Sequence, residues 1–172
     1  MTTTPAVALP QPRHEADGRG AASSRTPGRG GVVVVLGGGA VLVPLESVAE
    51  VARPPGLTRL PFLPAWLPGV ANHRGRVLPV VDLRPLLGVD APEPTRRARL
   101  VVLRDGETRV GLAVEAVRGV LPLPDELEPA PATVAAGTSG LVSGAVHPAD
   151  GPPLAVLDVD AVLALSEQVA GR

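Results

Sequence analysis

Three aspartates are the residues of this chain best placed for chemistry. Asp158 and Asp160 alternate along a short apolar run, and Asp82 ends another such run. Carboxylates at i and i+2 share one face of a strand, where they could act as general acid and base or as oxygen ligands of a metal ion. No third acidic or histidine ligand stands close by in the sequence, and each run precedes a helix-like segment. Asp82 and Asp160 are therefore predicted to cap helices, with a small metal-dependent enzyme using Asp82, Asp158 and Asp160 as the alternative.

Other catalytic residue types are missing or wrongly spaced. The chain has no cysteine and no lysine, which excludes thiolate nucleophiles, cysteine-ligated zinc, Schiff bases and a P-loop lysine. Its three histidines have no partner at zinc-like spacing, and Ser139 and Ser143 do not form the nucleophile elbow of a hydrolase. The glycines at 37–39 lack the spacing of a dinucleotide-binding turn. The favoured prediction is a protein that is not an enzyme and holds no metal or cofactor.

The charge and aromatic content argue against nucleic-acid and membrane partners. The net charge is −1, and the basic excess is confined to residues 1–31, a Pro-, Gly-, Ser- and Thr-rich tail that we expect to be disordered. One Phe, one Trp and no Tyr leave almost no surface on which bases could stack. The uncharged stretch 31–45 is too short to span a membrane and contains Pro44, so it is predicted as two strands joined by a glycine turn. We expect neither nucleic-acid binding nor direct membrane insertion.

The elements that must position any site are mostly strands. From Val32 onward, short Val- and Leu-rich runs alternate with Gly, Pro and Asp, which is typical of an all-β sandwich or barrel with an aliphatic core. Helical signals are few. The clearest is the C-terminal run that follows Asp160, whose loose apolar stripe is suited to docking against a barrel.

An internal repeat organises these strands. Residues 32–51 match residues 100–120 as strand, glycine turn, strand and a short amphipathic turn with a V-x-x-V ending, at a constant separation of 69 residues. The next strands also match, at residues 74–83 and 149–159. A unit of this size is too small to be robust alone. We therefore expect a domain over 32–172 built from two packed barrel subdomains, with a duplication spanning about 32–88 and 100–165.

The stretch Asn72 to Gly88, "NHRGRVLPVVDLRPLLG", carries three arginines around an apolar run. Arg74 and Gly75 stand in a predicted tight turn, where glycine permits the backbone and the planar guanidinium can bridge carbonyls or carboxylates. Such a turn can bind without catalysing. Two roles remain open: Arg74 contacts a partner, or it mainly closes the turn by pairing with a carboxylate such as Glu50.

The segment 60–88, "LPFLPAWLPGVANHRGRVLPVVDLRPLLG", resembles the central signature of CheW-like domains, the adaptor modules of bacterial chemosensory arrays. In that family a small apolar helix leads to G-V-x-N-L-R-G, then to an apolar strand with a proline and the sequence D-L-R. His73 stands where the family usually has leucine. The likeness extends over about Val32 to Ala164, and the matching residues of the signature are Trp66, Gly69, Val70, Asn72, Arg74, Gly75, Pro79, Asp82, Leu83 and Arg84.

The resemblance implies a fold of two packed five-stranded, SH3-like β-barrels with a few short helices and a C-terminal helix. It implies a non-enzymatic adaptor that couples the cytoplasmic tip of a methyl-accepting chemoreceptor to the regulatory domain of a CheA-type histidine kinase. Such an adaptor would be cytoplasmic and recruited to membrane-associated receptor arrays. A CheW-like paralogue in gliding, pilus or developmental signalling is the alternative within the same family.

The resemblance implies one set of site residues, and the turn and capping patterns described above predict a second set. The first set would lie at or beside the partner contacts: Val48, Glu50, Gly69, Arg74, Gly111 and Val117. The second set would shape turns and helix starts: Asn72, Gly75, Asp82 and Asp160.

Overall fold

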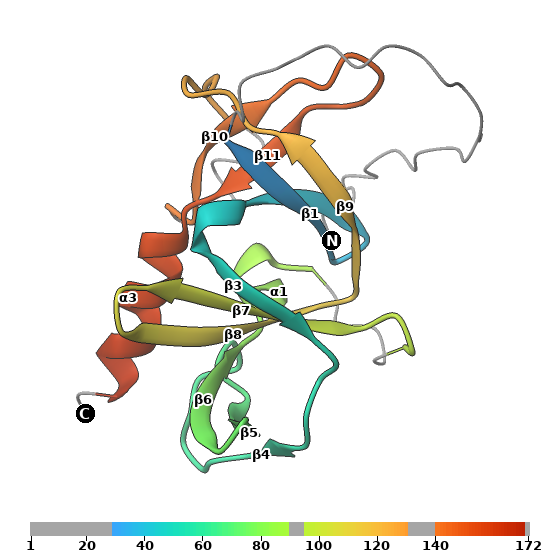
Figure 1. Cartoon of the computed structure of the whole chain (residues 1–172). Coiled ribbons are helices and arrows are strands. Elements are labelled where there is room, and N and C mark those ends of the chain that lie inside the picture. The colour runs from blue at the N-terminus through green and yellow to red at the C-terminus, as the bar shows by residue number, and fades with distance from the viewer. Residues whose placement is uncertain (1–28, 90–94, 131–139, 171–172) are drawn as a thin grey trace, which may run out of the picture.

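The computed structural model describes residues 29–89, 95–130 and 140–170 of the chain. Within these residues it consists mainly of strands arranged in two sheets, one above the other in Figure 1. The elements in chain order are β1 (Gly30–Leu36), β2 (Gly39–Pro44), a 3-10 turn (Leu45–Ser47), β3 (Val48–Ala52), β4 (Leu57–Thr58), β5 (Gly69–His73), β6 (Arg76–Val81), α1 (Arg84–Leu87), β7 (Arg99–Asp105), β8 (Thr108–Val114), β9 (Ala116–Pro122), β10 (Val142–Val146), β11 (Leu154–Leu157) and α3 (Val159–Ala170).

The first hairpin confirms the strand reading of the uncharged stretch. β1 and β2 pair from Gly31 opposite Pro44 to the turn, where Gly37 and Gly38 have φ values of 59° and 77°. Positive φ at both central residues is the geometry of a tight hairpin turn, which glycine adopts without strain. β1 is buried on both faces and so needs a continuous apolar run, not an alternating one.

The sequence repeat recurs as a structural repeat. β7 and β8 form a second hairpin, in which Leu100 opposite Ala113 is the counterpart of Gly31 opposite Pro44. The third strands repeat as well, down to a β-bulge: the pairing of β3 with β7 shifts around Ala49, and that of β9 with β1 shifts around the equivalent residue, Arg118. The 69-residue separation read from the sequence therefore holds along three consecutive strands.

The two sheets do not follow the two repeats. The five-stranded sheet has the order β10-β11-β2-β1-β9, and the six-stranded sheet has the order β3-β7-β8-β6-β5-β4. β3 follows β2 in the chain but pairs with β7, while β9 follows β8 but pairs with β1. Each repeat thus adds strands to the sheet that contains the hairpin of the other repeat, and the two units are interlocked (Figure 1).

The all-β fold class predicted from the sequence is confirmed. The strand counts are five and six where two five-stranded barrels were expected, because the two-residue β4 adds to the edge of the second sheet. Among the described residues, the edge strands of each sheet are not paired with each other by backbone hydrogen bonds. The units are therefore curled sheets and not fully closed barrels.

The main core lies between the two sheets and beneath α3. One cluster combines fully buried aliphatic side chains of both hairpins with the face of α3. Figure 1 shows α3 along one side of the molecule, where it contacts β7 and β8. The predicted C-terminal helix is confirmed, and no helix in the described part of the chain is long and apolar enough to cross a membrane. Representative members of the core are Val34, Val43, Val101, Leu103, Leu112 and Val162.

The start of α3 corrects one prediction. Asp158, not Asp160, accepts the hydrogen bond that caps the helix, from the backbone N–H of Ala161 at 3.0 Å. The helix begins at Val159, earlier than the sequence suggested, so Asp160 falls inside the first turn and is exposed. Its charge still faces the positive end of the helix dipole. The prediction of Asp160 as the cap is wrong by two residues.

Candidate functional site

The Arg-Gly motif forms the tip of the β5–β6 hairpin. Arg74 and Gly75 both have positive φ, 53° and 78°, which makes a two-residue turn of the type that favours Asn and Gly. Asn72 supports the turn from below, since its Oδ1 accepts a 2.9 Å hydrogen bond from the backbone N–H of Gly75. Arg74 tolerates the left-handed conformation because the turn is fixed on both sides.

Glu50 on β3 holds this turn from the opposite end of the sheet. Its two carboxylate oxygens face Arg74 Nη2 at 2.8 Å and His73 Nε2 at 3.3 Å. β3 is one edge of the six-stranded sheet and β5 lies next to the other edge, so the contact requires the sheet to curl upon itself. Side chains thus link the two ends of the sheet where backbone pairing does not. His73 is nearly buried in this arrangement, whereas the Arg74 side chain is 75% exposed.

The charge state of Glu50 follows from these neighbours. Burial raises the pKa of Glu50, but the hydrogen bonds from His73 and Arg74 and the positive charge of Arg74 outweigh that effect, so its pKa lies below the ordinary value. Glu50 therefore remains a carboxylate through the physiological range.

The lowered pKa of Glu50 gives a pH prediction. A carboxylate whose pKa is depressed by folding adds stability above its unfolded pKa, and that stability is lost as the pH falls through the folded pKa. We expect Glu50→Gln to melt below the wild type at pH 7, and the gap to close below about pH 4. Thermal melts between pH 3 and pH 8 measure this. Glu107→Gln, on an exposed turn, is the matched control, and a gap that persists at pH 3 would assign it to packing.

The other four predicted partner-contact residues form two pairs: two buried glycines, and two valines at equivalent positions of the repeat. Gly69 and Gly111 are buried, and their lack of a side chain lets other groups approach. A Cβ on Gly69 would lie 2.1 Å from the backbone oxygen of Thr58. Val48 and Val117, counterparts on β3 and β9, are half-buried against the main core. Gly69 and Gly111 therefore lie beneath the surface, whereas Val48 and Val117 are only partly accessible.

Gly69 yields a stability prediction. Gly69→Ala is expected to cost about 2 kcal/mol or more, because the methyl group would meet a backbone atom and the φ of 154° strains an L residue. Urea unfolding of the variant and of Gly56→Ala, where nothing lies within 4 Å of the added methyl, measures the difference. Equal stability of the two variants would show that β4 moves away freely from β5.

Two exposed apolar residues lie on edge strands, one of them next to Glu50, and the sequence did not predict them as contacts. Val51 on β3 and Val120 on β9 are 41% and 59% exposed, and they are equivalent positions of the two repeats. Both strands are sheet edges, with free backbone groups along one side. The V-x-x-V ending of each repeat was visible in the sequence, but only the strand pairing shows that both endings lie on edges.

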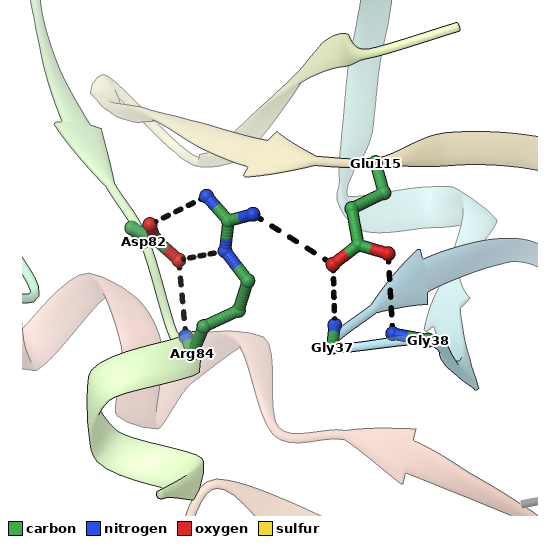
Figure 2. Close-up of polar contacts among 5 residues, drawn as sticks. All are labelled: Gly37, Gly38, Asp82, Arg84 and Glu115. Atoms are coloured by element: carbon green, nitrogen blue, oxygen red, sulfur yellow. Dashed lines mark hydrogen bonds and ion pairs between the residues drawn. The ribbon is translucent and has the colours of Figure 1, made fainter. Parts of the chain in front are cut away.

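A second polar cluster joins the two sheets, and Figure 2 shows its five residues. Arg84 donates two side-chain hydrogen bonds to Asp82, from Nε at 2.8 Å and from Nη2 at 2.7 Å, and its Nη1 lies 3.7 Å from Glu115. Glu115 in turn accepts hydrogen bonds from the backbone N–H groups of Gly37 at 2.7 Å and Gly38 at 3.1 Å. The Asp82 and Arg84 side chains are each only 13% exposed. We call this set the Asp82–Arg84–Glu115 cluster.

The cluster shows what Asp82 does. Its Oδ1 also accepts the backbone N–H of Arg84, the first residue of α1, so it serves the start of that helix from one residue before the N-cap. The hydrogen bonds to Asp82, followed by its negative charge, raise the pKa of Arg84, which is therefore a permanent cation here. Glu115 was not found from the sequence, because its partners are 77 and 78 residues away in the chain.

The three aspartates do not converge on one point. Asp82 is paired with Arg84, Asp158 caps α3, and Asp160 is exposed on the first turn of that helix. Among residues 29–89, 95–130 and 140–170, no three His, Cys, Asp or Glu side chains are grouped so as to hold a metal ion. The arrangement offers fixed charges and strand edges for docking.

These features define a β-rich binding module with two interlocked sheets. The family model for the CheW-like domain matches residues 30–167, and the chain belongs to the CheW-like family. The fold is that of the crystal structure of the scaffolding protein TtCheW from Thermoanaerobacter tengcongensis, with a TM-score of 0.69 at 23% identity, covering 81% of this chain and 90% of that one.

Curated relatives agree in sequence. The chain is 33% identical over 129 residues to the chemotaxis protein CheW of Rhizobium meliloti, covering 74% of this chain and 83% of that protein. It is also 35% identical over 94 residues to protein PilI of Pseudomonas aeruginosa, covering 55% of this chain. That match spans about half the length of PilI, 53%.

Proposed function

We propose that this protein is a non-enzymatic chemosensory adaptor that couples chemoreceptors to a CheA-type histidine kinase. The observation that carries the proposal is the β5–β6 turn, where a highly exposed guanidinium is held in a fixed position by Glu50. A preorganised arginine on a curled sheet is a docking group, because little conformational freedom is lost when a partner binds it. Family membership and the printed names of the relatives, a scaffolding protein and chemotaxis proteins, support the same function.

The two sheets supply two docking faces. We assign one face to the regulatory domain of the kinase and the other to the cytoplasmic tip of a methyl-accepting chemoreceptor. Val51 and Val120 provide exposed apolar contacts on the edge strands β3 and β9, while Arg74 and Glu50 provide polar contacts beside β3. Val48, Gly69, Gly111 and Val117 would act indirectly, by fixing the shape of these strands.

The mechanism is geometric. An adaptor with two moderate interfaces transmits a change in the receptor as a change in how the kinase is held, without any reaction of its own. Many such contacts in one array would add avidity. In this proposal the protein works on the cytoplasmic side of the membrane and is recruited there by its receptor partner.

Binding measurements test the proposal. Immobilised full-length protein is titrated with the regulatory domain of the organism's CheA-type kinase and, separately, with the helical-hairpin tip of its chemoreceptors. Saturable binding to both supports the adaptor, and Arg104→Ala, an exposed arginine at the far end of β7, should leave both affinities unchanged. Failure of the folded protein to bind any such kinase domain or receptor tip would refute the proposal.

A second candidate is an adaptor of the same kind in a pathway other than chemotaxis, such as gliding, pilus or developmental signalling. The match to PilI, which is not named as a chemotaxis protein, favours testing it. Where the organism has several CheA-type kinases, the ranking of affinities for their regulatory domains assigns the pathway. The tightest complex with the kinase of the chemotaxis system would exclude the second candidate.

A further inference from the structure

A cavity of about 540 Å³ is lined mainly by residues of the six-stranded sheet, together with Val35, Ala116 and Arg118 of the five-stranded sheet, and has no role in the docking proposed above. Its apolar floor includes Leu57, Val80 and Leu100, from three strands of that sheet. Cavities of this volume with an apolar lining and a few convergent polar groups are typical of small-molecule sites. The cavity is therefore large enough for a ligand with an apolar body.

Guanidinium groups form the rim of this cavity. Arg97, Arg99 and Arg118 line it and also line the adjoining hollow, so they lie together between the two spaces. Within the part of the chain that the structure describes, none of the three forms an ion pair with a carboxylate. Arg99 is partly fixed, since its Nη1 donates to the backbone oxygens of Arg96 and Ala98.

The carboxylates of the same cavity do not neutralise this rim. Asp82 is bound by Arg84, and Glu115 is bound by two glycine N–H groups and faces Arg84, as Figure 2 shows. Their charge is already compensated within the Asp82–Arg84–Glu115 cluster. Among the described residues, the three rim arginines therefore keep an uncompensated positive charge at the mouth of the cavity.

The internal repeat lacks arginine at the positions equivalent to two of these three residues. At the 69-residue separation, the counterparts of Arg99 and Arg118 are Gly30 and Ala49. Ala49 and Arg118 occupy the same backbone position in the two copies, at the β-bulge of the third strand. A β-bulge redirects the side chain of its extra residue and is frequent beside functional sites. At this bulge, one copy of the repeat therefore holds alanine where the other holds a positive charge.

From these observations we propose that this cavity binds a small organic anion with an apolar body, such as a medium-chain carboxylate or an alkyl phosphate. The anionic group would be held by the guanidiniums of Arg97 and Arg118, which can form paired hydrogen bonds to carboxylate or phosphate oxygens. The apolar body would cover Leu57, Val80 and Leu100. This site is separate from the Arg74 turn, and its failure would leave the adaptor function untouched.

Octanoate is the probe for the test, with acetate, inorganic phosphate and octanol as partial analogues. Titration calorimetry and thermal shift on the full chain should show saturable binding of octanoate and at least about tenfold weaker binding of each analogue, because each lacks either the tail or the charge. The double variant Arg97→Ala/Arg118→Ala should lose at least about tenfold in octanoate affinity. Its melting temperature without ligand should stay at the wild-type value, as the repeat predicts.

Controls separate the proposal from simpler explanations. Arg104→Ala should bind octanoate as the wild type does, and Arg97→Lys/Arg118→Lys should recover part of the affinity because it keeps the charge but not the paired geometry. Binding of acetate or phosphate as tight as that of octanoate would show that the rim arginines attract anions in general, which would overturn the proposed site. Full octanoate binding by the double alanine variant would also overturn it. Arginine-dependent sedimentation with phosphatidylglycerol vesicles, without octanoate binding, would also overturn it, in favour of a membrane surface.

Discussion

Replacing Arg84 by alanine is expected to destabilise the protein by about 2 to 4 kcal/mol, the largest effect of any polar substitution considered. The substitution removes the cation that Asp82 and Glu115 share. Because the Asp82 side chain is largely buried, solvent cannot compensate the negative charge that remains. An unpaired charge at low exposure costs more than a surface ion pair, which is worth less than about 1 kcal/mol. Urea unfolding with a constant m-value measures the loss.

Companion variants show whether the loss comes from the pairing itself. Asp82→Asn/Arg84→Ala removes both charges, so it should be more stable than Arg84→Ala alone, with the coupling read from a double-mutant cycle. Arg29→Ala, which breaks the exposed pair of Arg29 with Glu46, is the surface control. A cost for Arg84→Ala as small as that of the surface control would mean that the Asp82–Arg84–Glu115 cluster does not hold the sheets together.

Replacing Arg74 by alanine is expected to weaken binding to a protein partner by about 30-fold or more while lowering the melting temperature by only a few degrees. The guanidinium is mostly exposed, so its pair with Glu50 adds little stability, whereas an anchored arginine at the centre of an interface often dominates affinity. The measurement is the affinity for the kinase regulatory domain and for the receptor tip, alongside a thermal melt.

The same variant decides between the two roles considered for Arg74. A fall in stability with unchanged affinity would show that the arginine mainly closes the turn against Glu50. Arg76→Ala, two residues further on and exposed, controls for the general loss of positive charge. Unchanged affinity for both partners would remove Arg74 from the docking surface.

Local patterns in the sequence were sufficient for much of the fold. The β1–β2 hairpin, the repeated hairpin and the C-terminal helix were each predicted, because glycine turns and apolar periodicity act over a few residues. The pairing of Arg74 with a carboxylate such as Glu50 was also one of the two roles predicted for the turn. The exact partners of Glu50, which are Arg74 and His73, required the curled sheet.

The exchange of third strands could not be predicted in this way. β3 and β9 have nearly the same sequence pattern, so each could pair with either hairpin, and only three-dimensional packing selects the partner. Glu115 could not be predicted for the same reason, because the backbone N–H groups that donate hydrogen bonds to it come from the other repeat. The error at Asp160 has a different origin: two aspartates alternate at the helix start, and sequence alone does not say which one is the cap.

The interlocked sheets also constrain how the protein can be made. β1 and β2 emerge first during synthesis, yet their neighbours β9 and β11 belong to the last third of the chain, and Val41 pairs with Ala155. Distant pairings of this kind form slowly, and domains fold as units. The β1–β2 hairpin must therefore wait, with its apolar faces uncovered, until β9 and β11 have been synthesised. During that interval the exposed apolar surface makes the nascent chain prone to aggregation and a substrate for chaperones.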